Sequence, residues 1–207
     1  MYWAEFFTIA VAHLFAVASP GPDFAIVTRQ CMSGGTRAGV WTSLGVSSAI
    51  LLHVTYCILG VALLLAQSTT LFNSMKYLAA AYLVYLGVQS IRASFRQTNT
   101  ALFTRGEVAI SPSKAFVVGF LTNGLNPKAT LFFLALFTVV IDSNTPSSIQ
   151  ILYGLYLAIA TFLWFSMLSK ILGRPNVRAL IIKTRNWVER GMGAILILLA
   201  LQISMSA

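Results

Sequence analysis

Residues 19–23 read Ser19-Pro20-Gly21-Pro22-Asp23 and interrupt the first hydrophobic stretch of this chain. A second interruption, Asn126-Pro127-Lys128, lies inside the fourth stretch. Proline removes a backbone donor and clashes with the preceding turn, and an ionised side chain costs about 3 kcal/mol at the centre of a membrane helix. Broken, charged segments are tolerated at membrane depth where they line a cavity. The two breaks therefore indicate a cavity of the kind that transporters use.

The composition places the chain in a membrane. Of its 207 residues, 57% are hydrophobic and 9% are charged, with a mean hydropathy of +0.81, so charged groups are too few to cover a soluble globule of this size. The net charge of +9 comes without interleaved aromatic or glycine-rich motifs, so we expect no nucleic-acid partner. Cys31 and Cys57 have no CxxC motif or paired histidine nearby, so we predict no metal site, and no motif indicates a cofactor.

Six apolar runs predict an all-α integral membrane protein with six transmembrane helices in contact with lipid. Each run is close to the length of about 20 residues that crosses a bilayer. The runs cover residues 4–28, 39–66, 71–91, 114–141, 147–171 and 187–205.

The basic residues predict which way the spans point. Apart from Lys76 and Lys128, every lysine and arginine lies in or beside the first, third and fifth connections, and the second and fourth contain none. The positive-inside rule then places the odd-numbered loops in the cytoplasm and both termini in the periplasm. The residues concerned are Arg29, Arg37, Arg92, Arg96, Arg105, Lys114, Lys170, Arg174, Arg178, Lys183, Arg185 and Arg190.

Parity then predicts an inverted repeat. A half with three spans makes the next half enter the membrane from the opposite side, and inverted repeats with matching broken helices are common in secondary transporters. We expect a single membrane domain, 1–207, in which 1–96 is the first three-helix repeat, 97–113 a cytoplasmic linker and 114–207 the second repeat. Helices 1 and 4 carry the breaks.

Asp23 is the acidic residue placed well inside a predicted span. The other four fall at span ends or in loops: Glu5, Glu107, Asp142 and Glu189. A buried carboxyl group can load and release a proton, so we expect Asp23 to be the proton-coupling residue. For Lys128 two roles stay open: it binds the substrate carboxylate, or it forms a permanent ion pair with Asp23 that holds the halves together.

The breaks also predict where a substrate binds. A helix that restarts after a proline has free amide groups at the positive end of its dipole, and the break frees carbonyl oxygens such as that of Asn126. Gly21 supplies the dihedral range that a tight break requires. A zwitterion finds partners for both of its ends there. The predicted substrate-binding residues are Ser19, Pro20, Gly21, Pro22, Asp23, Asn123, Asn126, Pro127 and Lys128.

Five secondary candidates have equally plain alternatives. Thr122 belongs to the polar cluster in span four, where hydrogen bonding between helices is the alternative. Lys76 is close enough to the outer boundary to reach lipid headgroups. Tyr82 and Tyr85 share a helix face, which favours packing, and His13 is a packing histidine or part of a proton path.

The two motifs together resemble those of a known family. Ser19 to Asp23, followed by Gly-Leu-Asn-Pro-Lys-Ala at 124–129, is similar to the LysE/RhtB superfamily of bacterial amino-acid exporters over essentially the whole chain. The resemblance implies proton-driven export of an amino acid across the cell inner membrane. The run from His13 through Asp23 most resembles the threonine and homoserine efflux branch. Exporters of basic amino acids share the Pro-Gly-Pro region, so they are the alternative.

Other classes of protein fit less well. A metal exporter needs several ligands, and one intramembrane carboxylate is available. An intramembrane enzyme needs a nucleophile with its base, and no GxSxG or HExxH occurs. A structural membrane protein would use the glycines for helix packing alone. A homodimer is one way to shield six spans of which two are broken, and the sequence leaves the oligomeric state open.

Overall fold

The structure is a computed structural model that describes residues 2–67, 69–95, 110–142, 144–172 and 174–205. Every regular element in these ranges is a helix. Most of the predicted linker, 97–109, and the side chain of the secondary candidate Lys76 lie outside the described residues. The elements are α1 (Tyr2–Ala18), α2 (Pro22–Gln67), α3 (Thr69–Ala93), α4 (Pro112–Gly124), α5 (Pro127–Ala135), the π-helix η2 (Leu136–Val140), α6 (Ser147–Ile171) and α7 (Pro175–Met205).

Both predicted helix breaks are confirmed. The first span is divided between α1 and α2 by Ser19, Pro20 and Gly21, and the fourth between α4 and α5 by Leu125 and Asn126. Pro22 and Pro127 are the first residues of the restarted helices. Proline suits this position because its missing N–H would have no intrahelical partner there.

Gly35, and not Gly21, has the unusual backbone conformation. Among the described residues it is the one with positive φ (φ 75°, ψ −179°), so the expectation for Gly21 was wrong. The conformation suits glycine because no Cβ clashes with the backbone. It divides α2 into two differently directed helices, of which the first completes the broken first span.

In the described parts of the chain, two helices are individually long and apolar enough to cross a membrane. They are Pro22–Gly60, 39 residues that include Gly35, and Ser147–Ile171, 25 residues; Tyr2–Ala18 and Pro127–Thr138 are shorter apolar helices. The breaks explain why the first and fourth predicted spans appear as short pieces. Large apolar side chains, including Trp3, Phe7 and Leu163, are exposed on the outside, as contact with lipid requires.

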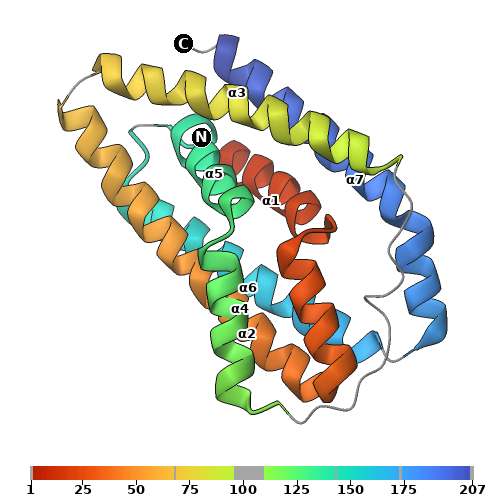
Figure 1. Cartoon of the computed structure of the whole chain (residues 1–207). Coiled ribbons are helices and arrows are strands. Elements are labelled where there is room, and N and C mark those ends of the chain that lie inside the picture. The colour runs from red at the N-terminus through yellow and green to blue at the C-terminus, as the bar shows by residue number, and fades with distance from the viewer. Residues whose placement is uncertain (1, 68, 96–109, 143, 173, 206–207) are drawn as a thin grey trace.

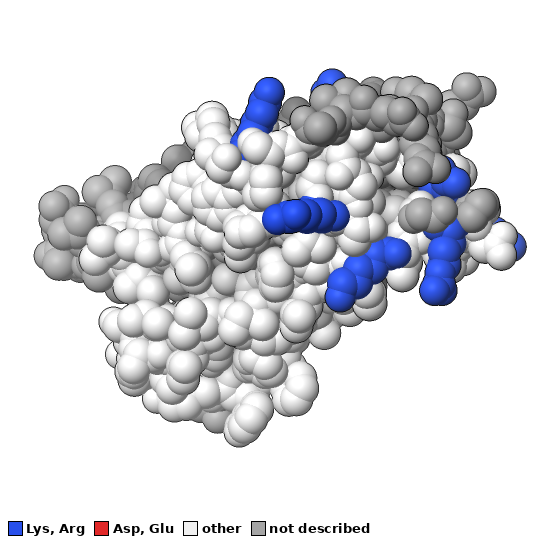
Figure 2. Space-filling view, turned by 90° about the horizontal axis from the view of Figure 1, so that it is seen from below, with Lys and Arg blue, Asp and Glu red and all other residues white. Residues whose placement is uncertain are grey.

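The connections alternate between two ends of the molecule (Figure 1). Both termini, the α2–α3 junction and the start of α6 lie toward the left and top, while the turn within α2, the start of α4 and the α6–α7 junction lie toward the bottom and right, and α3 ends at the right. Figure 2, seen from below, shows lysine and arginine side chains over the centre and right of the molecule, and no acidic side chain among the described residues visible on that face.

Two apolar clusters form the core and meet near the helix breaks. The larger includes Ile9, Leu83 and Leu157 from α1, α3 and α6, and the smaller joins Phe24 of α2 to Phe165 of α6. α2 packs along α4 and α6, and α3 packs along α7. This arrangement brings the two breaks into the interior of the helix bundle.

Glu5 is buried, although its place at a span end suggested otherwise. Its carboxylate accepts hydrogen bonds from Thr145 Oγ1 (2.9 and 3.1 Å), from Tyr153 Oη (3.1 Å) and from the backbone N–H of Asp142 (3.2 Å). These donors belong to α6 and to the segment before it, so Glu5 ties the start of α1 to the second half of the chain.

Backbones of α2 and α4 approach closely at two glycines. A Cβ on Gly45 would lie 2.0 Å from the carbonyl oxygen of Phe116, and one on Gly119 would lie 2.2 Å from that of Thr42. Small residues permit such contact between membrane helices. The contact places Asn123, one turn after Gly119, beside α2.

We expect Gly45→Ala to lower the melting temperature by about 5 °C, because overpacking costs about 1–3 kcal/mol. Thermal unfolding of the purified protein in detergent measures the change. Gly60→Ala in the same helix is the matched control, since a Cβ there meets nothing within 4 Å. Equal melting temperatures for the two variants would contradict the close approach of α2 and α4.

Candidate functional site

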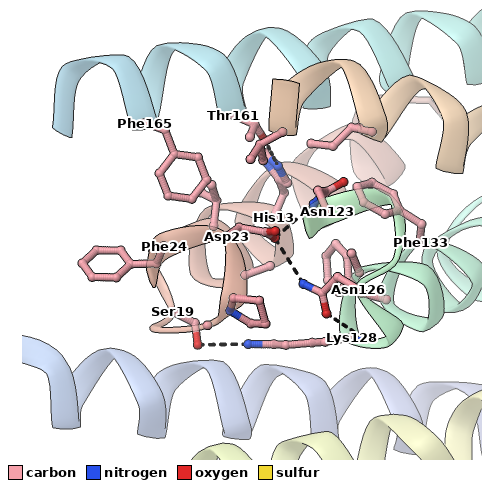
Figure 3. Close-up of a pocket in the computed structure, with 18 of the residues that line it drawn as sticks. His13, Ser19, Asp23, Phe24, Asn123, Asn126, Lys128, Phe133, Thr161 and Phe165 are labelled. Atoms are coloured by element: carbon pink, nitrogen blue, oxygen red, sulfur yellow. Dashed lines mark hydrogen bonds between the residues drawn. The ribbon is translucent and has the colours of Figure 1, made fainter. Parts of the chain in front are cut away.

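One cavity contains most of the predicted site residues (Figure 3). Its empty volume is about 600 Å³, part of it open to solvent. Pro20 and Pro127 are not on its wall, and the other seven predicted substrate-binding residues are. The polar lining residues are His13, Ser19, Asp23, Asn123, Asn126, Lys128 and Thr161.

Asp23 connects the two helix breaks. Its Oδ2 accepts hydrogen bonds from Asn123 Nδ2 (3.0 Å), in the last turn of α4, and from Asn126 Nδ2 (3.3 Å), the N-cap of α5. Its other oxygen, Oδ1, is buried without a hydrogen-bond partner among the described residues. One carboxylate oxygen therefore holds the breaks together while the other stays available.

Asn126 completes the start of α5. Its Oδ1 accepts from the backbone N–H of Lys128 (3.0 Å), so it caps the helix. Its carbonyl oxygen accepts from the N–H (3.0 Å) and the hydroxyl (3.2 Å) of Thr130. The predicted free carbonyl at Asn126 was therefore wrong, and at least one amide at this helix start is already used.

Lys128 extends across the cavity toward the other break. Its Nζ donates to Ser19 Oγ (3.2 Å), and a Cβ on Gly21 would lie 3.7 Å from the same nitrogen. Lys128 and Asp23 both belong to the part of the chain that the structure describes, and no direct ion pair joins them there. Their charges still interact through space. The permanent ion pair, one of the two predicted alternatives, is not formed in this structure.

His53 supports Asn123 from behind the cavity wall. Its Nε2 bonds to the carbonyl oxygen of Asn123 (3.1 Å), its Nδ1 bonds to the hydroxyl of Tyr56, and its ring stacks on Phe133 (5.3 Å between centroids). A carbonyl only accepts, so Nε2 carries the proton. His53 is thus a hydrogen-bonded packing histidine. Nothing in its sequence neighbourhood indicated that its partner would be a site residue.

The secondary candidates divide into two groups. His13 lies on the cavity wall, where its Nε2 bonds to Thr161 Oγ1 of α6 (2.9 Å), and Thr161 was not predicted. Tyr82, Tyr85 and Thr122 do not line the cavity. Tyr82 packs at the edge of the larger core cluster, which confirms the packing alternative for it.

The cavity offers opposite charges and unpaired acceptors. Asn123 Oδ1, like Asp23 Oδ1, is buried and has no partner among the described residues. A buried acceptor without a donor costs about 1–3 kcal/mol, so these atoms favour a ligand with N–H donors. The described residues contain no group of three potential metal ligands from histidine, cysteine, aspartate and glutamate. Most of the remaining wall is apolar, including Phe24, Phe132 and Phe165.

The sequence of this chain is similar to those of several known efflux proteins. The threonine efflux protein of Escherichia coli strain K12 is 25% identical over 193 residues, and that of Salmonella typhi is 24% identical over 192 residues; each alignment covers 92% of both chains. A leucine efflux protein of Klebsiella pneumoniae subsp. pneumoniae is 30% identical over 169 residues, 79% of this chain and 77% of the relative. No solved structure matches the chain significantly.

A family model described as LysE type translocator matches residues 14–207, almost the whole chain. The predicted resemblance is thereby confirmed at the level of the family. The chain belongs to the LysE-type translocators, integral membrane proteins of amino-acid efflux, and is a transporter and not an enzyme.

Proposed function

We propose that this translocator exports small neutral amino acids of the threonine and homoserine type in exchange for protons, binding them in the cavity between the two broken helices. The observation that carries the proposal is the pair of unpaired buried oxygens, Asp23 Oδ1 and Asn123 Oδ1, in a cavity that also holds Lys128. The oxygens accept the substrate ammonium group. Lys128 Nζ and Ser19 Oγ bind its carboxylate.

The cavity wall favours a neutral side chain. Asp23 is the acidic residue of the cavity lining, and the α-ammonium group uses it. A basic side chain would place a second cation there without a carboxylate partner, which is expensive in a low dielectric. The His13 and Thr161 pair offers hydrogen bonds to a hydroxyl, and the phenylalanines accept methyl groups. Relatives named for threonine and for leucine efflux agree with a neutral substrate.

Competition for one oxygen atom explains the exchange. A proton and an ammonium group cannot both occupy Asp23 Oδ1, because each fills the same acceptor site. Asp23 thus loses its proton when substrate binds and takes up a proton when substrate leaves. The periplasm supplies the proton, and the amino acid leaves in the other direction.

The proposed architecture is the inverted repeat of six spans, and contacts between the halves support it. His53 of α2 bonds to the carbonyl of Asn123 in the broken fourth span, and Thr161 of α6 bonds to His13 in the broken first span. α3 and α7, the third helices of the two halves, pack on each other. The basic face of Figure 2 is the cytoplasmic side, which leaves both termini in the periplasm.

Counterflow in proteoliposomes tests the substrate class. Threonine, homoserine and leucine are expected to exchange, and lysine is not. Threoninamide and N-acetylthreonine should fail to compete, because one lacks the carboxylate for Lys128 and the other the ammonium for Asp23.

Lys128→Met is expected to weaken threonine binding at least about 10-fold, the value of a charge-assisted hydrogen bond, while Lys114→Gln at the start of α4 changes nothing. Failure of every neutral amino acid to exchange would exclude the proposal.

Proton coupling is tested at Asp23. In the wild type, acidification is expected to raise the half-saturating threonine concentration without changing the maximal exchange rate, since protons compete with substrate. Asp23→Asn should abolish threonine accumulation driven by an imposed proton gradient. Asp142→Asn, at an exposed carboxylate outside the cavity, is the control. Gradient-driven accumulation that survives Asp23→Asn would show that another group carries the proton.

A further inference from the structure

Glu189 is a buried carboxylate outside the site described so far. Its position at the start of the sixth predicted span, 187–205, suggested a place at the end of a span, but it lies within α7 and is 2% exposed. Met192, three residues later, lines the cavity, and residues three apart share a helix face. Glu189 therefore lies on the cavity side of α7.

Half of the Glu189 carboxylate has no partner. Oε1 accepts from Arg185 Nε at 2.9 Å, and Oε2 is buried without a hydrogen bond to any described residue. An unpaired buried carboxylate oxygen is costly, so a donor for Oε2 is expected in another state of the protein. Arg185 lies one turn away and already uses the first oxygen.

Lys128 is the cation placed to be that donor. Its charge interacts with both Asp23 and Glu189. The ammonium group has three N–H donors, and Ser19 Oγ accepts from it at 3.2 Å. In Figure 3 the Lys128 side chain runs beside the ribbon of α7 on its way to Ser19.

We propose that Glu189 is a positioning residue that competes with the substrate carboxylate for Lys128. In this structure Lys128 donates to Ser19 Oγ, and Glu189 Oε2 has no partner among the described residues. In a second state of the substrate-free protein Lys128 donates to Glu189 Oε2, and an arriving carboxylate takes over that donor. On release, Glu189 recovers Lys128 and completes the departure of the substrate. The role rests on the proposed amino-acid site, because it requires a carboxylate at Lys128.

The test compares Glu189→Gln with Arg185→Gln in threonine counterflow. Removing the competing charge in Glu189→Gln is expected to lower the half-saturating threonine concentration about fivefold and the maximal exchange rate about tenfold, within the usual range of couplings between sites. Arg185→Gln frees Glu189 to hold Lys128 and should raise the half-saturating concentration. Glu189→Asp should recover most of the exchange rate. Melting temperatures of all variants are measured in detergent.

A purely structural ion pair would act differently. Glu189→Gln and Arg185→Gln would then lower the melting temperature alike and move the half-saturating concentration in the same direction, which would overturn the proposal. If Glu189→Gln does not purify as folded protein, Arg185→Gln alone tests the proposal: a higher half-saturating threonine concentration supports it, and an unchanged concentration overturns it. Failure of the wild type to exchange any amino acid would instead exclude the proposed function. A normal wild type with an unchanged Glu189→Gln excludes only the role of Glu189.

Discussion

The hydrogen bonds from Asn123 and Asn126 to one oxygen of Asp23 are the constraint on which the site depends. A helix broken inside a membrane leaves backbone groups that lipid cannot satisfy. Here the asparagine that caps α5 is also a donor to Asp23, and the asparagine near the end of α4 is held by His53. The same side chains therefore satisfy hydrogen-bonding groups at the helix breaks and build the cavity wall.

The breaks and their charges could be predicted from the sequence because their causes are local. A proline removes its own N–H wherever it stands, and Asp23 and Lys128 are too costly in lipid to face outward. The predicted parity of the spans led us to expect that both breaks would line one cavity, and residues of both breaks do line one. The start of α5 could not be predicted in the same way. The break suggested that the carbonyl oxygen of Asn126 would be free, but it accepts hydrogen bonds from Thr130.

What the sequence could not predict depends on contacts between distant segments. Glu5 and Glu189 lie near the ends of apolar runs, where solvent is the ordinary environment, yet both are buried by partners on other parts of the fold or one turn away. Thr161 is one polar residue in an apolar helix, and its pairing with His13 spans 148 positions. Burial of this kind follows from packing, which no local pattern encodes.

The charges around the cavity bear on how a membrane potential could drive export. Asp23, Lys128, Glu189 and Arg185 sum to zero, and a zwitterionic substrate leaves the sum at zero. With the cavity empty and Asp23 protonated, the same group carries one positive charge. A potential negative inside acts on that second state alone, by about 2.3 kcal/mol per 100 mV for a charge that crosses the whole field. In the proposed exchange, the proton-loaded protein is drawn toward the inward-facing state, and the substrate-loaded protein returns outward without electrical opposition.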